Sequence, residues 1–172
     1  CRSPLATLPS ECRPQERIIF NVNNHQYTTR VDVLPDGGVH WIAGGSSHNW
    51  LSLTGIKFVT NKGSKTQVSF LHGARNYGGE YEGAYYSIIN GECVLGGLIT
   101  KGSSWEVAQL PSTCRPEKAL IFNVNNHQCT MRLDIYTDGK IVAITGVCHG
   151  WVSLSGVSFI PKDSKSSSSA LA

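Results

Sequence analysis

A chain of 172 residues with a formal net charge of +3 is long enough for one domain or two small ones. Its lysines and arginines are scattered, which argues against nucleic acid as a partner, and no apolar run approaches the roughly 18 residues of a membrane span. Val, Ile, Thr, Ser and Gly are abundant, whereas strong helix formers do not dominate. The composition therefore favours short strands joined by tight turns.

An octapeptide, IFNVNNHQ, occurs at 19–26 and again at 121–128. The similarity extends in both directions, so that LPSECRPQERIIFNVNNHQYTTRVDVLPDGGVHWIAGG (8–45) aligns with LPSTCRPEKALIFNVNNHQCTMRLDIYTDGKIVAITGV (110–147). After a one-residue deletion, WLSLTGIKF (50–58) aligns with WVSLSGVSF (151–159). Self-similarity at a fixed spacing indicates that a structural unit was duplicated.

The repeated unit has the alternating pattern of β-strands. ERIIFNV (16–22) predicts a strand, RVDVLPDGGVHWIA (30–43) predicts two strands around an Asp-Gly turn, and WLSLTGIKF predicts another with a bulge at Gly55. Between the copies, TQVSFLHG, GAYYSIIN and ECVLGGLIT predict three more strands, the last two joined by an Asn-Gly turn. We expect an all-β fold, an antiparallel β-sandwich of two internally repeated modules stapled by disulfides.

The strand pattern divides the chain into four parts. We expect an incomplete first module over 1–60, a connecting strand or loop over 61–76, a complete second module over 77–161 and a flexible Ser-rich tail over 162–172. The first copy lacks the strands that correspond to 77–99. Either the chain was cut from a longer repeat protein, or the segment 60–73 and a neighbouring subunit complete the first module.

The second module resembles a known repeat. NYGGEYEGAYYSIINGECVLGGLI (76–99), LPSTCRP (110–116), MRLDIYTDG (131–139) and WVSLSGVSF (151–159) are similar to the C-terminal repeat of bacteriophage tail-fibre and receptor-binding proteins. The resemblance implies an all-β attachment module that is often trimeric and often binds carbohydrate. Cysteine replaces the usual Gly-Tyr element in SECRP and STCRP, which suggests an exported, disulfide-containing, lectin-like relative.

Six cysteines without a CxxC pair or zinc-type spacing favour disulfides formed in an oxidising compartment. Cys12 and Cys114 are equivalent and need equivalent partners, and Cys93 lies on the strand before the second CRP. The last two cysteines have no counterparts in the first copy and pair best with each other. The predicted pairs are Cys1–Cys12, Cys93–Cys114 and Cys129–Cys148, with an interchain bond from Cys1 as the alternative. A chain that opens at Cys1 without a signal peptide suits a processed protein, so we expect secretion.

Motifs for catalysis are missing from the sequence. It contains no GxSxG, HExxH, P-loop or GxGxxG-helix pattern, and the neighbours Cys148 and His149 would point to opposite faces of a strand.

Arg30 and Asp32 share a strand face. A cross-strand ion pair explains this pair of charged residues better than a calcium site, because calcium needs six to eight oxygen ligands. We expect no enzyme, no cofactor and no obligatory metal.

Ligand binding is the class of function that the sequence leaves open. Proteins bind neutral sugars through hydrogen bonds from polar side chains and through an aromatic ring that packs on the apolar face of the sugar. The repeated NNHQ segments are either such a site or Asx-type turns, and the sequence favours neither. Trp50 and Trp151 each open an apolar strand and are expected in the core. His149 matches His48 only if the deletion precedes it. The ligand-binding candidates are Asn24, His25, Gln26, Trp41, His48, Asn49, Arg75, Glu80, Asn126, His127, Gln128 and His149.

The sequence therefore predicts a secreted lectin that binds glycans or glycoproteins without catalysis and forms a homo-oligomer, a trimer or a dimer. The alternative is a structural fibre, matrix or attachment protein whose repeats assemble with neighbouring chains and bind no sugar.

Overall fold

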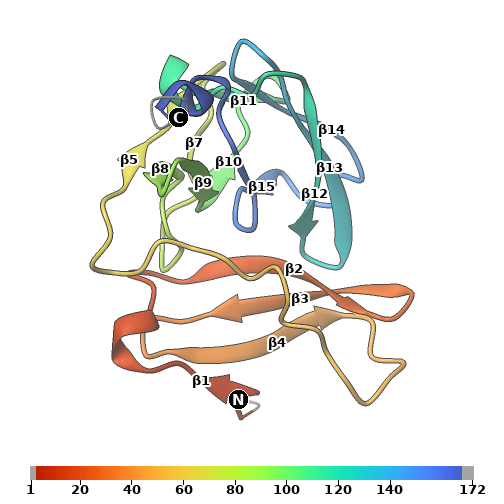
Figure 1. The fold of residues 1–172 in the computed structure, drawn as a ribbon. Coiled ribbons are helices and arrows are strands. Elements are labelled where there is room, and N and C mark those ends of the chain that lie inside the picture. Colours follow the sequence, from red (N-terminus) through yellow and green to blue (C-terminus); the bar gives the residue numbers. More distant parts are fainter. Residues whose placement is uncertain (1–2, 168–172) are drawn as a thin grey trace.

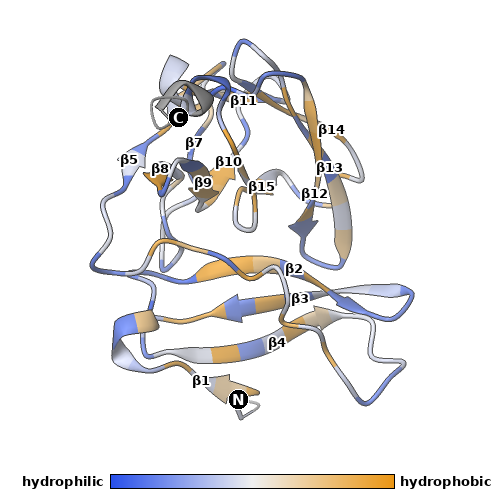
Figure 2. Cartoon of the chain, viewed as in Figure 1, coloured by the Kyte–Doolittle hydropathy of each residue, from blue (hydrophilic) through white to orange (hydrophobic). Residues whose placement is uncertain are grey.

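The computed structural model describes residues 3–167, and the predicted all-β fold is confirmed (Figure 1). The first module is a four-stranded antiparallel sheet in the order β1-β4-β3-β2. Its strands are β1 (Ala6–Thr7), β2 (Ile18–Asn24), β3 (Tyr27–Val33) and β4 (Gly38–Gly44). Figure 2 shows hydrophobic and hydrophilic residues alternating along β3 and β4, as expected of strands whose successive side chains point to opposite faces.

The second module contains the equivalent sheet and a layer opposite it. The first layer is β12 (Leu120–Asn126), β13 (Cys129–Ile135), β14 (Lys140–Thr145), β11 (Glu106–Gln109) and β6 (Ser69–Phe70). The second layer consists of two small sheets. One is β16 (Ser158–Phe159), β9 (Glu92–Gly96), β8 (Tyr85–Ile89) and β5 (Thr66–Gln67); the other is β15 (Trp151–Ser153), β10 (Leu98–Thr100) and β7 (Arg75–Asn76).

The main core lies between these layers. Leu133, Ile135 and Ile141 from the first layer meet Leu95 and Ile99 from the second, all fully buried. Two of the predicted disulfides are present. Cys93 of β9 is bonded to Cys114, and Cys129 is bonded to Cys148. Cys12 is exposed and forms no disulfide within residues 3–167; its predicted partner Cys1 lies outside the described residues.

The predicted turns are also present. Asn90 and Gly91 join β8 to β9 with φ values of 50° and 79°. In the Asp-Gly turns, Asp36 Oδ1 accepts from the Gly38 amide at 2.8 Å and Asp138 Oδ1 accepts from the Lys140 amide at 3.0 Å. Each aspartate thus satisfies the backbone of its own turn, which is why this dipeptide marks a hairpin.

One predicted strand forms in only one of the two copies. Residues 151–159 supply β15 and β16 because β10 and β9 pair with them, but 50–58 form no strand, since the first module has no such partners. Leu51, Ile56 and Phe58 pack on the first sheet without strand pairing. Gly55 is not a bulge; it lies in a turn with φ 92°.

The segment between the copies belongs to the second module. β5 pairs with β8, and β6 pairs with β11. Within residues 3–167, the first module has no second sheet opposite its own, and an apolar cavity of 250 Å³ lies on that side of it. The walls of the cavity include Leu8, Cys12, Val33 and Phe58.

The described part of the chain ends in a short 3-10 helix, η3 (Lys162–Ser167), whose first backbone amide donates to Arg115 O at 2.9 Å. Two further 3-10 turns are η1 (Ser10–Cys12) and η2 (Ser112–Cys114).

Candidate functional site

The duplicated NNHQ segment forms the same two-residue hairpin turn in both modules. β2 and β3 close at Asn24–Tyr27, and β12 and β13 close at Asn126–Cys129. The first turn residue is histidine with positive φ, 60° at His25 and 65° at His127. A side chain is uncommon in this region, although histidine is among the residues enriched there. Each turn therefore presents an imidazole at its tip.

The preceding asparagines hold these turns. The Asn23 amide donates to His25 O at 2.7 Å, and the Asn125 amide donates to His127 O at 3.1 Å. Asn125 Oδ1 also accepts from the His127 backbone at 2.9 Å. The contact from the His127 backbone to Asn125 Oδ1 is the Asx-type contact that the sequence allowed as one interpretation of the motif.

Asn24 and Asn126 are fully buried and clamp a second loop against the hairpin. The Asn126 amide donates to His149 O (3.3 Å) and Trp151 O (2.7 Å), while its Oδ1 accepts from the Cys148 and His149 amides (2.7 and 2.6 Å). The Asn24 amide donates likewise to the carbonyls of His48 and Trp50. These two amides position loops and do not face a ligand.

The clamp brings together two histidines and a tryptophan in each module. In the first, the His25 and His48 rings lie 4.4 Å apart, and His48 stacks on Trp50 at 5.7 Å. In the second, the His127 and His149 rings lie 5.1 Å apart, and His149 stacks on Trp151 at 6.0 Å. We call these the first and second His–Trp clusters. Their geometry makes His149 the equivalent of His48.

The tryptophans correct one expectation. Trp50 is 47% exposed and Trp151 is half-buried, so neither is a core residue. Both lie against histidine because the buried asparagine ties their carbonyls to the hairpin tip. Each cluster consequently combines a flat apolar ring with imidazole nitrogens at the surface.

The second cluster lies at the junction of the modules. Arg30 of β3 reaches it, with Nη1 3.2 Å from His127 Nδ1 and the guanidinium carbon 5.8 Å from the centre of the Trp151 ring. Burial, Arg30 and His149 lower the pKa of His127. The neutral imidazole that this favours can accept a hydrogen bond at Nδ1. The first cluster has no such cation among the contacts of the described residues.

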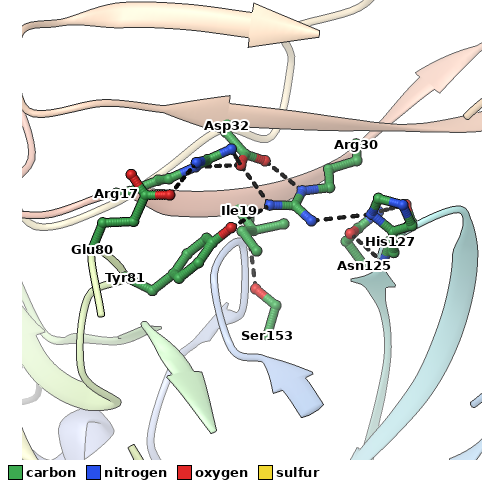
Figure 3. A network of polar contacts seen from close by, with 9 residues as sticks. All are labelled: Arg17, Ile19, Arg30, Asp32, Glu80, Tyr81, Asn125, His127 and Ser153. Carbon is green, nitrogen blue, oxygen red and sulfur yellow. Dashed lines mark hydrogen bonds and ion pairs between the residues drawn. The ribbon is translucent and has the colours of Figure 1, made fainter. Parts of the chain in front are cut away.

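Arg30 is held by a buried polar network (Figure 3). Asp32 is fully buried and accepts from Arg17 Nε at 2.6 Å and from Arg30 Nε and Nη2 at 2.7 and 2.6 Å. Arg30 Nη2 lies 3.2 Å from the Tyr81 hydroxyl. The expected shared face of Arg30 and Asp32 is thus correct, but their ion pair lies within one strand and Arg17 completes it.

The equivalent network of the second module is open. Arg132 and Asp134 are paired at 2.8 Å, but the Arg132 side chain is 43% exposed. Ile19, whose carbonyl accepts from Ser153 Oγ at 2.9 Å, is 2% exposed, whereas its equivalent Ile121 is 62% exposed. The surface around this position is therefore covered in the first module and exposed around Ile121 and Arg132 in the second.

The remaining candidates do not join the clusters. Gln26, Gln128 and Asn49 are exposed on the same loops, Trp41 is half-buried in β4, and Arg75 is exposed on β7. Glu80 pairs with Arg17 at 2.5 Å. Sequence reasoning missed that Arg30 reaches the second cluster and that Tyr81 contacts Arg30, because contacts between modules leave no local pattern in either repeat.

The chain matches no protein-family model, no curated protein and no solved structure in comparisons with known proteins. Its fold and paired clusters define a disulfide-stapled, all-β protein of two repeated modules. The two disulfides indicate an oxidising environment. Within residues 3–167 no helix has the length and apolarity to cross a membrane, and no three His, Cys, Asp or Glu side chains are grouped to hold a metal.

Proposed function

We propose that this protein is a secreted lectin that binds glycans, free or on glycoproteins, through its His–Trp clusters, without catalysis. The observation that carries the proposal is the duplicated arrangement of one indole and two imidazoles, fixed in both modules by a buried asparagine. A preorganised arrangement avoids part of the entropy cost of ordering loops on binding.

The chemistry of the clusters suits a sugar. The apolar C–H face of a pyranose can lie on the exposed indole of Trp50, while hydroxyl groups exchange hydrogen bonds with His25 and His48. At the second cluster, Arg30 already covers part of Trp151, so the two sites differ in polarity. We expect the first cluster to accept the larger apolar sugar surface.

Weak single sites become useful through multivalency. Two clusters in each chain, multiplied by assembly into a dimer or trimer, would raise apparent affinity by roughly 10²–10⁴. The open face around Ile121 and Arg132 supports such an assembly, because its equivalent in the first module is buried by protein. The resemblance of the second module to tail-fibre attachment repeats supports the same function.

The alternative is a structural fibre, matrix or attachment protein that binds no sugar. The open Ile121 face favours it, since modules that pack non-reciprocally can extend into a filament. Size-exclusion chromatography with light scattering distinguishes the two, because a filament grows with concentration and a lectin oligomer has a fixed mass.

A glycan array probed with the native protein tests the lectin proposal. Binding that falls when both Trp50 and Trp151 are replaced by alanine supports it, and an array without any bound glycan contradicts it.

A further inference from the structure

The apolar cavity of the first module corresponds to a part of the second module that is filled by protein. Its walls include Leu8, Cys12, Val39, Leu53, Ile56 and Phe58. Their equivalents in the repeat lie in the main core at 0–7% exposure and are Leu110, Cys114, Ile141, Leu154, Val157 and Phe159. In the first module, by contrast, Leu53 is 42% exposed and Cys12 is also exposed. Equivalent side chains thus surround protein in one copy and a cavity in the other.

Strand β9 fills this place in the second module. Its Cys93 is bonded to Cys114, and its Leu95 is fully buried in the same core. The strand pairs with β16, where Phe159 lies opposite Cys93, and the Leu95 amide donates to Val157 O at 2.9 Å. Residues two apart on a strand point to the same face. A strand with a cysteine and, two residues later, an aliphatic side chain therefore completes this core.

The first module retains the edge on which such a strand would pair. The turn before this edge has the same geometry in both copies, because the Ile56 amide donates to Leu53 O at 3.3 Å and the Val157 amide donates to Leu154 O at 3.3 Å. The segment that follows, 57–58, is the equivalent of β16 and pairs with no strand among the described residues. An edge that already has its paired shape loses little entropy when a strand is added.

Cys12 sets the chemistry of the occupant. Its equivalent Cys114 is bonded to Cys93, whereas Cys12 lines the cavity, is exposed and forms no disulfide within residues 3–167. A second copy of this chain cannot supply the strand without opening its own second module, because its β9 is already paired and bonded there. The occupant must therefore be a strand with its own cysteine that is not already part of such a module.

We propose that the open side of the first module binds an extended strand of a partner protein with the pattern of β9, a cysteine followed two residues later by an aliphatic side chain. The aliphatic side chain fills the cavity, the strand pairs with 56–58, and the cysteine bonds to Cys12. The bond forms by thiol–disulfide exchange. The Cys12 thiolate attacks the partner cysteine within its disulfide to a small thiol, the new sulfur–sulfur bond forms, and the small thiol leaves as its thiolate. Such assembly does not depend on glycan binding by the His–Trp clusters.

The probe is the peptide YYSIINGECVLGG, the sequence of 85–97, with its cysteine joined to thionitrobenzoate. The protein is the full chain with Cys1→Ser, which leaves Cys12 as the one cysteine outside the two disulfides. Release of thionitrobenzoate gives the rate of exchange, and peptide mapping gives the site. A control peptide with Leu95→Asp keeps the reacting disulfide but lacks the side chain that fills the cavity. We expect the first peptide to react faster than the control by roughly tenfold or more.

Two protein variants separate docking from simple thiol reactivity. Leu53→Asp places a charge on the cavity wall at a position that is already 42% exposed, so it should abolish the rate advantage without unfolding the module. Ile144→Asp, at an isoleucine 43% exposed on β14, is the matched control and should retain the advantage.

Hydrogen exchange of the peptide adduct tests the strand pairing itself. We expect new protection of the backbone amides at 56–58, because an added strand supplies their hydrogen-bond partners. Equal rates for the two peptides, a bond that maps to a cysteine other than Cys12, or an adduct that leaves 56–58 unprotected would overturn the proposal. A dimer joined through Cys12 that blocks the reaction would also overturn it, since a second copy would then be the occupant.

Discussion

Ile19 and Ile121 occupy the same position of the repeat, yet Ile19 is 2% exposed and Ile121 is 62% exposed. The difference arises because the second module covers this part of β2, where Ser153 donates to the Ile19 carbonyl, while the Ile121 end of β12 is exposed. One sequence position thus has two environments, and the exposed one is suited to contact another protein surface.

We predict that Ile121→Asp weakens self-association. Burial of an isoleucine contributes about 1.5–3 kcal/mol, so its loss should raise the dissociation constant of the oligomer by roughly tenfold to a hundredfold. Sedimentation equilibrium measures this constant. Ile88→Asp, at an isoleucine 45% exposed on β8, is the matched control and should leave it unchanged. Equal effects of the two variants would show that the Ile121 face is not the interface.

The two Arg–Asp pairs provide a comparison of buried and exposed ion pairs. Asp32→Asn leaves Arg17 and Arg30 without their shared counter-charge and should lower the free energy of unfolding by about 3–5 kcal/mol. Asp134→Asn breaks a pair whose arginine is 43% exposed and screened by solvent, and it should cost clearly less than Asp32→Asn. Urea unfolding of both variants checks the difference. Equal costs would mean that the junction does not bury the first pair.

Asn126→Ala should destabilise the protein by about 1–3 kcal/mol, because it leaves the Cys148 and His149 amides and the Trp151 carbonyl without their partner. Gln128→Ala, two residues away and exposed, should change stability by no more than about 0.5 kcal/mol. Thermal or urea unfolding gives both values. If Asn126→Ala were as stable as the wild type, Asn126 would not hold the 148–151 loop against the hairpin.

The junction should weaken in acid because of His127. Its folded-state pKa is lowered from the ordinary 6.5 by burial, Arg30 and His149, so the unfolded state takes up a proton more readily. The stability contributed by neutral His127 is present above pH 6.5 and is lost as pH falls below it towards the folded-state pKa.

His127→Asn should therefore flatten the decline of unfolding free energy below pH 6.5, measured by urea titrations at several pH values. His25→Asn, at the equivalent position of the first module, is the control for loss of the turn histidine itself. If the unfolding free energies of the wild type and His127→Asn depended on pH in the same way, the contact between Arg30 and His127 would not be pH-dependent.

Much of the fold was predictable because its signals are local. Asp-Gly and Asn-Gly turns set the hairpins, alternation placed Arg30 and Asp32 on one face, and the repeat itself pointed to the Cys93–Cys114 pair. The failure of 50–58 to form a strand was not predictable from its own pattern, because a strand also needs a partner and the first module lacks one.

The candidate site was predictable only in part. The sequence identified the turn histidines and the loop around His48. It could not show that Asn24 points inward, because its partners are backbone groups more than twenty residues away. For the same reason the sequence predicted Trp50 in the core, although the asparagine clamp holds its indole at the surface. Long-range contacts determine both the inward orientation of Asn24 and the surface position of Trp50.

Glycan binding by the His–Trp clusters is decided by a glycan array with matched tryptophan variants. We predict that the wild-type protein binds a defined set of glycans, that Trp50→Ala/Trp151→Ala weakens this binding by roughly tenfold or more, and that Trp41→Ala, at a tryptophan outside the clusters, does not. If binding survives in the double variant, or if the wild-type protein binds no glycan, the His–Trp clusters are not glycan-binding sites.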